Sequence, residues 1–235
     1  FIFSSLIFSK AIPSVVLPSP MEVIRSAISL WTDRKLALNV GYSFLRVGEG
    51  FLMAVLIAFP LGVLMGTFSR IKSMFSPLMV FSGYTPIAAL VPLTMLFGTG
   101  ELQKAVFLTI AFGIYLLPLF VRAIEEVDNV YLQTAYTLGA NRFQAMNRVL
   151  LRVAMPNMFD AMRMGFGVGW SYIILVEMVD LGAGGLGALI LNSQRIGPKE
   201  HIFLILLTIV VLAFITDKIW EKIGNWLFPY RGLKR

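Results

Sequence analysis

The sequence predicts an all-α protein that crosses a membrane several times. Of its 235 residues, 57% are hydrophobic and only 14% are charged, and the mean hydropathy is +0.80. An ordinary soluble domain carries roughly 25% charged residues. Several apolar stretches approach about 20 residues, the length that spans a hydrocarbon core of roughly 30 Å. A soluble enzyme is therefore nearly excluded, and a polytopic protein with about six transmembrane helices is expected.

The first elements are short or interrupted. The apolar stretch Phe1–Ser9 is too short to cross a bilayer, so we expect it to be the end of a truncated first helix. Prolines follow, and residues 20–31 then predict an amphipathic helix that lies on the membrane surface. Residues 50–69 contain no charged side chain and form the clearest single span.

The middle of the chain contains a proline-interrupted apolar stretch, an uninterrupted apolar span and a charged stretch, in that order. Residues 73–100 are uncharged but contain three prolines, which predicts a bent or broken helix packed within protein. Residues 105–121 give a further span. Residues 125–163 are polar and carry too many charges to cross lipid, so we expect them to form a hydrophilic loop with helical segments.

The last elements return to apolar sequence. Residues 164–179 contain three glycines and predict a span, a Gly-rich loop follows, and residues 201–215 begin the final span. We therefore expect one transmembrane domain, residues 1–235, whose core spans lie within about residues 41–225.

The distribution of charge predicts the orientation. The chain has 20 Lys and Arg against 13 Asp and Glu, a net charge of +7. Twelve of the 20 basic residues lie on the side of the hydrophilic loop and the C-terminus, and seven lie on the other side. The positive-inside rule then places this loop and the C-terminus in the cytoplasm. Because membrane topology explains the excess of Lys and Arg over Asp and Glu, no nucleic-acid partner is expected.

A motif in the hydrophilic loop resembles the EAA signature of binding-protein-dependent ABC importer permeases: Glu-Ala-Ala, three residues, Gly, nine residues, then Ile-x-Leu-Pro. Ala135, Gly139 and Leu151 match at that spacing. Four positions depart from it: Gln133, Thr134, Val149 and Arg152. The resemblance implies a coupling helix that contacts an ATPase subunit through Gln133, Thr134, Ala135, Leu138, Gly139, Ala140, Leu151 and Pro156.

The matches and departures have physical consequences. Gln133 lacks the charge of the usual Glu but could still form hydrogen bonds at a helix start. With Arg152 in place of proline, we expect the second helix of the loop to continue to Pro156 and to end there. A turn at Gly139 suits a residue without Cβ, which permits a positive φ and the close approach of another chain; a simple helix cap is the alternative.

Motifs along most of the chain resemble one branch of this family, the sulfonate, taurine, nitrate and bicarbonate type permeases. They occur in the order that the branch shows, at residues 17–20, 43–47, 60–62, 85–93, 97–98 and 176–187. The resemblance implies the type I ABC importer permease fold and the transport of a small anionic solute.

The resemblance also implies partners and a location. We expect a homodimer in the bacterial inner membrane, two ATPase subunits on the cytoplasmic side, and a periplasmic or lipid-anchored substrate-binding protein outside. No GxxxxGK[ST] phosphate loop occurs in the chain, so ATP and Mg are expected on the partner ATPase and no cofactor on this subunit. The permease itself would catalyse no bond change.

Polar residues in the proline-interrupted stretch are candidates for the translocation path. They are Ser82, Tyr84, Thr85 and Pro86. Backbone groups freed by the proline and the neighbouring hydroxyls could line a polar path, or the hydroxyls could only solvate the bend. The sequence does not decide between these two interpretations.

An acidic residue near the end of an apolar span is a further candidate. Glu177, followed by Asp180, lies at a depth where acids are costly and are commonly paired or functional. Glu177 is a candidate for the path, but a carboxylate would repel an anion. A structural or gating pair with Arg46 is therefore favoured over contact with cargo.

Three further motifs have simpler explanations. Residues 182–187 fit GxGxxG, but no βαβ pattern surrounds them, so a flexible turn or a loop on the gate side is expected rather than a nucleotide site. Two GxxxG pairs, residues 62–66 and 165–169, predict close helix packing within the subunit or, alternatively, a homodimer seam. The single histidine, His201, predicts interfacial packing, and no cluster of ligand residues indicates a metal.

Two other classes of protein remain as alternatives. A secondary transporter or channel driven by an ion gradient should show paired intramembrane charges and inverted repeats, and no convincing repeat is visible. A membrane-embedded enzyme should show a convergent polar site, and the sequence shows none. The ABC permease interpretation is therefore preferred.

Overall fold

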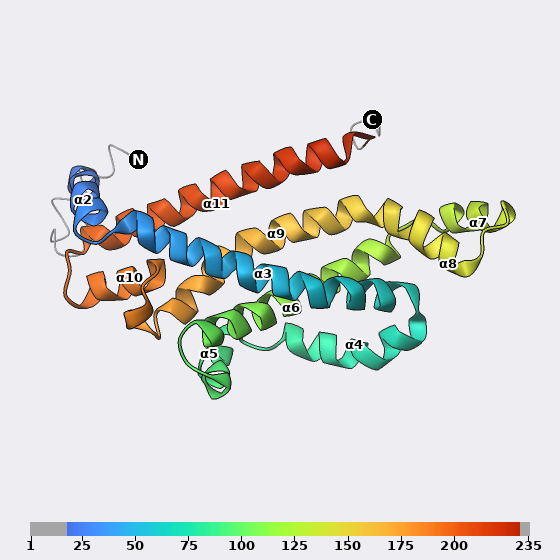
Figure 1. Cartoon of the computed structure of the whole chain (residues 1–235), viewed down its shortest axis with the longest axis horizontal. Helices are drawn as coiled ribbons and strands as arrows, with labels where there is room; N and C mark the ends of the chain where they lie inside the picture. Colours follow the sequence, from blue (N-terminus) through green and yellow to red (C-terminus); the bar gives the residue numbers. More distant parts are fainter. Residues whose placement is uncertain (1–17, 231–235) are drawn as a thin grey trace.

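The computed structural model describes residues 18–230, and all regular elements in this part of the chain are helical, which confirms the predicted all-α class. The long helices that run along the molecule in Figure 1 are α3 (Leu36–Thr67), α6 (Glu101–Glu125), α9 (Leu151–Glu177) and α11 (Glu200–Leu227). The shorter elements are α2 (Pro20–Thr32), α4 (Ser69–Gly83), η1 (Ile87–Ala89), α5 (Leu90–Thr94), η2 (Met95–Phe97), α7 (Asn129–Thr137), α8 (Arg142–Gln144), the π-helix η3 (Ala145–Leu150), η4 (Leu181–Ala183) and α10 (Leu186–Arg195).

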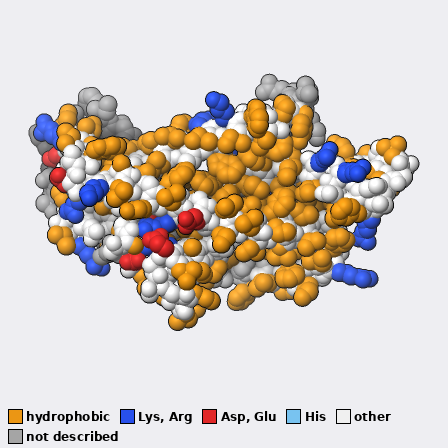
Figure 2. All heavy atoms as spheres, in the orientation of Figure 1, with side chains coloured by type: hydrophobic (Ala, Val, Ile, Leu, Met, Phe, Trp, Pro, Cys, Tyr) orange, Lys and Arg blue, Asp and Glu red, His pale blue; other side chains and the backbone are white. Residues whose placement is uncertain are grey.

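The molecule is elongated, and its two ends differ. Helices α2 and α10 lie at one end, here called the α10 end, and α7 and α8 lie at the other, here called the α7–α8 end (Figure 1). Hydrophobic side chains cover most of the visible middle of the molecule, while many Lys and Arg side chains lie toward the ends (Figure 2). This distribution is typical of a protein whose middle faces lipid.

The described residues confirm several spans but not the predicted number of six. Three helices, α3, α6 and α11, are long and apolar enough to cross a membrane. The segments Ser69–Gly83 and Ile87–Phe97 pass the same test together, although they are bent by 91°. This bend confirms the broken helix expected from the prolines. Helix α9 has 27 residues but carries several charges in its first half. The truncated first helix lies outside the described residues.

A row of small residues on α3 brings it close to α6. The row repeats every four residues and consists of Gly50, Ala54, Ala58, Gly62 and Gly66. A Cβ atom added at Gly62 would lie 2.6 Å from Cβ of Phe120, and one at Gly66 would lie 2.6 Å from Cβ of Ile124. Only glycine leaves room for this approach, which is the packing that GxxxG spacing permits in membranes.

The second GxxxG pair packs α9 against α6. A Cβ atom at Gly165 would lie 2.6 Å from Cδ2 of Leu116, and one at Gly169 would overlap the ring of Phe112. Both GxxxG pairs therefore pack within the subunit, as the preferred interpretation expected. Helix α6 packs against both α3 and α9 and supplies many of the fully buried side chains of the core.

Helix α3 begins well before the uncharged stretch that predicted it. It starts at Leu36 and includes Asn39, Ser43 and Arg46, all of which are buried. The polar residues do not end the helix because each has hydrogen-bond partners at the α10 end. Charge alone therefore placed the start of this span too late.

The predicted hydrophilic loop, residues 125–163, is only partly a loop. Its second half belongs to α9, which continues without interruption into the apolar span. The predicted helix end at Pro156 is wrong, since Pro156 lies buried inside α9. A proline interrupts one backbone hydrogen bond but does not end a helix whose faces pack against neighbours. Arg163 is accommodated by two bonds to Asp217 of α11, at 2.6 and 2.7 Å.

The amphipathic helix expected at residues 20–31 is α2, which packs against α11. Leu30 is fully buried, and the hydroxyl of Ser29 lies 3.0 Å from Nε2 of His201. His201 is itself buried, in agreement with the predicted packing role. The opposite side of α2 exposes Ile28 and Trp31, which suits contact with a membrane surface.

Candidate functional site

A polar segment projects at the α7–α8 end of the molecule (Figure 1). We refer to residues 129–150, which form α7, α8 and η3, as the α7–η3 segment. Helix α7 begins after Asp128, whose carboxylate accepts a hydrogen bond from the Val130 N–H at 2.9 Å. Gln133 lies in the middle of α7, so the expectation that it sits at a helix start is wrong. The acid that caps this helix comes five residues earlier.

The turn expected at Gly139 is present. Gly139 has a φ of +83°, which residues with a Cβ rarely adopt. Its N–H donates to the carbonyl of Tyr136, and the Ala140 N–H donates to the carbonyl of Ala135, both at 3.0 Å. These bonds satisfy the last carbonyls of α7 in the manner of a glycine cap. The glycine therefore ends α7 and makes the turn at once.

Four of the residues that the signature marked are exposed on this segment: Gln133, Thr134, Leu138 and Gly139. Leu138 is 83% exposed, although it is a large apolar side chain on a polar projection. Ala135 is buried and Ala140 is half-buried. Leu151 and Pro156 lie in α9 instead, so the segment does not present them as part of one surface.

The second helix of the segment begins with a capping box. The Gln144 N–H donates to Oδ1 of Asn141 at 2.8 Å, and the Asn141 N–H donates to Oε1 of Gln144 at 3.0 Å. The Asn-x-x-Gln spacing in the sequence is the signal that predicts this helix start. From Gln144 the chain passes through the π-helix η3 directly into α9. The segment is thus continuous with a long core helix.

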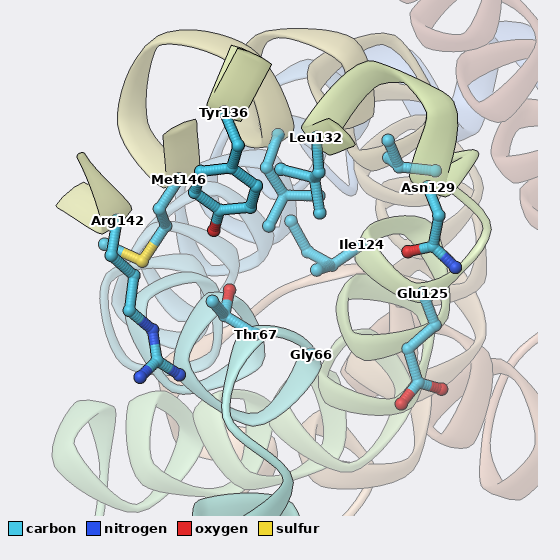
Figure 3. A pocket seen from close by; sticks show the side chains of 11 residues that line it. Gly66, Thr67, Ile124, Glu125, Asn129, Leu132, Tyr136, Arg142 and Met146 are labelled. Carbon is cyan, nitrogen blue, oxygen red and sulfur yellow. The ribbon is translucent and has the colours of Figure 1, made fainter. Parts of the chain in front are cut away.

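A cavity of about 320 Å³ lies between the α7–η3 segment and the ends of α3 and α6. In Figure 3, Tyr136, Arg142 and Met146 of the segment extend into the same space as Thr67 of α3 and Ile124 of α6. The segment therefore rests on the helix ends through a partly open contact, which leaves room for it to shift.

Two polar contacts reinforce this end. The guanidinium of Arg142 lies 5.0 Å from the ring centroid of Phe68, at the junction of α3 and α4. Lys72 of α4 forms an ion pair with Glu125, the last residue of α6. Cation–π contacts and exposed ion pairs are each worth about 1 kcal/mol or less. The first contact positions the segment against the α3–α4 junction without locking it, and the second joins α4 to the end of α6.

The α10 end contains a buried network of charges that centres on Arg46 of α3. Its Nε and Nη2 donate to both carboxylate oxygens of Glu101, at 2.7 and 2.6 Å. Its Nη1 donates to Glu177 at 2.7 Å and to the carbonyl of Gly184 at 2.9 Å, and Nη2 also donates to the carbonyl of Ala183 at 2.7 Å. The predicted pair of Arg46 with Glu177 is confirmed.

Glu177, the last residue of α9, is fully buried. Besides Arg46, its carboxylate accepts hydrogen bonds from the hydroxyl of Ser43, at 2.8 and 2.9 Å, and from the Gly187 N–H, at 2.9 Å. A buried carboxylate is stable only when its oxygens are satisfied in this way. This environment favours the structural role over a place on an open path.

A second cation joins the same network. Lys104 is fully buried, and its Nζ lies 3.2 Å from Oε1 of Glu101 and 3.1 Å from Oδ2 of Asp180. Asp180 therefore pairs with Lys104 and not with Arg46. We refer to Ser43, Arg46, Glu101, Lys104, Glu177 and Asp180 as the ion-pair network. It ties α3, α6 and the end of α9 together.

The Gly-rich loop that fits GxGxxG is held by α3. The Gly185 N–H donates to Oδ1 of Asn39 at 2.7 Å, and the Leu186 N–H donates to the hydroxyl of Ser43 at 2.9 Å. Gly184 and Gly185 have positive φ values, and a Cβ at Gly185 would overlap the Glu177 carboxylate. The glycines thus let the backbone approach the network, and the loop is fixed rather than the flexible turn that was expected.

The candidate path residues lie around the bend between α4 and η1. The hydroxyl of Ser82 donates to the carbonyl of Met79 at 2.9 Å, and that of Thr85 donates to the carbonyl of Phe81 at 3.2 Å. These two hydroxyls therefore solvate the bend. Tyr84, in contrast, is 85% exposed.

The comparisons with known proteins identify the family. Residues 50–220, well over half of the chain, match the family model "Binding-protein-dependent transport system inner membrane component". The chain belongs to this family. This membership confirms the predicted family. Such a protein is the membrane subunit of a transporter and not an enzyme, and the ATPase of the system is a separate subunit.

Named relatives of this permease include several importer subunits. A probable ABC transporter permease of Brucella abortus is 28% identical and covers 93% of this chain and 87% of its own length. The taurine transport system permease protein TauC of Escherichia coli is 25% identical, covering 95% and 83%. The putative aliphatic sulfonates transport permease protein SsuC of Bacillus subtilis is 24% identical, covering 94% and 82%.

A solved structure supports the fold. The MetNI methionine ABC transporter in an inward facing conformation matches with a TM-score of 0.73 at 19% identity, covering 81% of this chain and 94% of that chain. The predicted type I ABC importer permease fold is therefore confirmed for this permease.

Proposed function

We propose that this permease imports a small anion, or a zwitterion that carries an anionic group, delivered by a substrate-binding protein. The names of two relatives support this class, since taurine and aliphatic sulfonates share a sulfonate group. The single permease domain would form the path as a homodimer in the bacterial inner membrane. A periplasmic or lipid-anchored binding protein would dock at the α10 end.

We also propose that the α7–η3 segment is the contact for two ATPase subunits, which bind ATP and Mg. Twelve of the 20 Lys and Arg lie on the side of this segment and of the C-terminus, which supports a cytoplasmic location for both. The observation that carries the proposal is the exposed apolar residue Leu138 beside the Gly139 turn on a polar projection. Leu138 is not alone, since Tyr136 and Phe143 of the same segment are also exposed, and a group of exposed apolar side chains commonly marks a protein contact.

The proposed chain of events follows from the connections of the segment. It is joined to α6 through residues 126–128 and to α9 through η3. When the ATPases close, a displacement of the segment would move both helices. The path for cargo would pass the bend at Tyr84, Thr85 and Pro86. Glu177, whose buried carboxylate is bonded to Arg46 and Ser43, and Ser82, which lines the apolar cavity between α4, α3 and α6, are not retained in this path.

A substitution at Gly139 tests the coupling proposal. Gly139→Trp should leave the protein inserted but abolish the stimulation of ATP hydrolysis by cargo-loaded binding protein, because Trp disfavours the positive φ and occupies the docking surface. The matched control is Gly167→Trp, since Gly167 is an exposed glycine in the middle of α9, away from both ends of the molecule, with open space around it. Undiminished stimulation in the Gly139 variant would refute the proposal.

A further inference from the structure

Helix α4 has two faces of different chemistry. On one side, Phe75, Met79 and Ser82 line an apolar cavity of about 400 Å³ that α4 forms with α3 and α6. The opposite side carries, at helical spacing, Ser69, Arg70, Ser73, Ser76, Pro77, Val80, Phe81 and Tyr84. We call this second side the hydroxyl face. No residue of α4 is buried.

Two open cavities follow one another along the hydroxyl face. The first, of about 550 Å³, is lined by Phe68, Ser69, Arg70, Ile71 and Arg142. The second, of about 620 Å³, is lined by Ser73, Ser76, Pro77, Val80, Phe81 and Tyr84. Together they extend from the α7–α8 end to the bend that follows α4.

The cations at the α7–α8 end of this face are available to an anion. Among the described residues, neither Arg70 nor Arg142 forms an ion pair, whereas the neighbouring Lys72 is paired with Glu125. Arg142 is instead held over the ring of Phe68, which fixes its guanidinium at the rim of the first cavity. Two guanidinium groups from distant parts of the chain thus meet at one cavity.

The position of the hydroxyl face in the protein restricts what can cover it. Helix α4 is half of a bent span. Polar and ionisable residues in spans face the interior of the bundle or a water-filled cavity, because contact with hydrocarbon is costly. The side of α4 toward the bundle lines an apolar cavity, and its polar residues are Ser82 and the paired Lys72. The other polar residues, Ser69, Arg70, Ser73 and Ser76, line the cavities on the side that the subunit leaves open.

We propose that the hydroxyl face of α4 lines a water-filled path for anions and that Arg70 and Arg142 form its mouth at the α7–α8 end. The inference rests on the proposed function, and it extends the path from the bend at Tyr84 to the end of the protein. A second copy of the chain that faces this side would close the open cavities into a channel. Fixed cations at a mouth raise the local concentration of anions and exclude cations.

The absence of cysteine from the sequence makes the proposal directly testable. Single variants Ser76→Cys, on the hydroxyl face, and Ser82→Cys, on the apolar side of the same helix, form a matched pair. Open membrane fragments that hold the assembled transporter are treated with a charged, water-soluble methanethiosulfonate reagent, which modifies thiolates only where water reaches them. Each variant is also labelled after denaturation to measure its total thiol.

Ser76→Cys should react about tenfold faster than Ser82→Cys. Equal or slower reaction at Ser76→Cys would mean that lipid or protein covers the hydroxyl face, and the proposal would be wrong. This experiment requires no cargo, ATP or binding protein. Its result is therefore independent of whether Gly139→Trp uncouples the transporter.

A second comparison tests the charge of the mouth. The variant Ser73→Cys is treated in parallel with two reagents, anionic sulfonatoethyl methanethiosulfonate and cationic trimethylammonioethyl methanethiosulfonate. The measured quantity is the ratio of the anionic to the cationic labelling rate. Adding Arg70→Gln should lower this ratio about threefold or more, because one nearby positive charge is lost. Adding Arg122→Gln, which removes a cation paired with Glu126 near the same end, should leave the ratio unchanged. An unchanged ratio with Arg70→Gln would overturn the role of this residue.

Discussion

The two ends of this permease differ in whether their ion pairs are buried or exposed. At the α10 end, Arg46, Lys104 and Glu177 are buried, and each of them has an oppositely charged partner within the ion-pair network. At the α7–α8 end, pairs such as Arg122 with Glu126 are exposed, and the segment that projects there rests on a cavity. The difference teaches that buried, paired charges keep three helices together at one end, whereas the other end, which carries the segment proposed to contact the ATPases, is joined to the helix bundle by weaker, exposed contacts.

The largest expected effect is the loss of an acid from the ion-pair network. Glu177→Ala leaves Arg46 buried with one carboxylate fewer and removes the acceptor of the Ser43 hydroxyl and the Gly187 N–H. Breaking a buried pair in this way costs roughly 3–5 kcal/mol. Thermal unfolding of the purified permease in detergent should show a strongly lowered midpoint.

The control for this change is Glu126→Ala, which breaks an exposed pair at the other end and should hardly alter the midpoint. If both variants unfolded at the same temperature, the α10 end would not be the more stabilised one, and the contrast between the ends would have no energetic basis.

An intermediate effect is expected on assembly rather than on stability. Leu138→Asp places a charge on the exposed apolar residue of the α7–η3 segment and should prevent co-purification of the ATPase subunits. Because Leu138 is 83% exposed, the unfolding midpoint should stay nearly constant. Pull-down of a tagged permease measures the first quantity, and thermal unfolding measures the second.

Ile196 supplies a matched control, since it is 87% exposed at the α10 end. Ile196→Asp should retain the ATPase subunits. Loss of the ATPases in both variants would show that an added acid harms assembly wherever it is placed, and retention in both would exclude Leu138 from the contact.

The smallest expected effect concerns the exposed pair of Arg122 with Glu126. The two side chains are 75% and 49% exposed, and they lie four residues apart on neighbouring turns. Arg122→Ala should lower stability by only about 0.3–0.5 kcal/mol, because water and salt screen such a pair. A loss of stability well above this value in a thermal unfolding experiment would show that the Arg122–Glu126 pair contributes substantially to the stability of the fold.

Much of the fold follows from sequence patterns that depend on local physics. Uncharged stretches located α6 and the prolines located the bend after α4, because a hydrocarbon environment and a missing N–H act on the residues themselves. The same local reasoning failed for the start of α3 and for Pro156. In both places, contacts with distant segments decide whether the helix continues.

The candidate sites show the same limit. The turn at Gly139 and the Arg46–Glu177 pair were predictable, the first from spacing and the second from the cost of an unpaired acid in a membrane. The participation of Lys104 and Asp180 was not, because 76 residues separate them and only the packing of α6 beside the end of α9 brings them together. Likewise, the hydroxyl face of α4 is visible in sequence, but its open side is known only from the fold.

The small residues on α3 have a consequence for how force travels. At Gly50, Gly62 and Gly66, α3 lies so close to α6 that an added Cβ would overlap side-chain atoms of α6. The two helices therefore cannot slide past one another without steric clash, and they are expected to move as one rigid unit. A displacement of these two helices at the α7–α8 end would therefore be accompanied by a displacement of similar size at the α10 end. Nucleotide-driven motion on one side of the bilayer could thereby reach the entrance on the other side without a relay of local rearrangements.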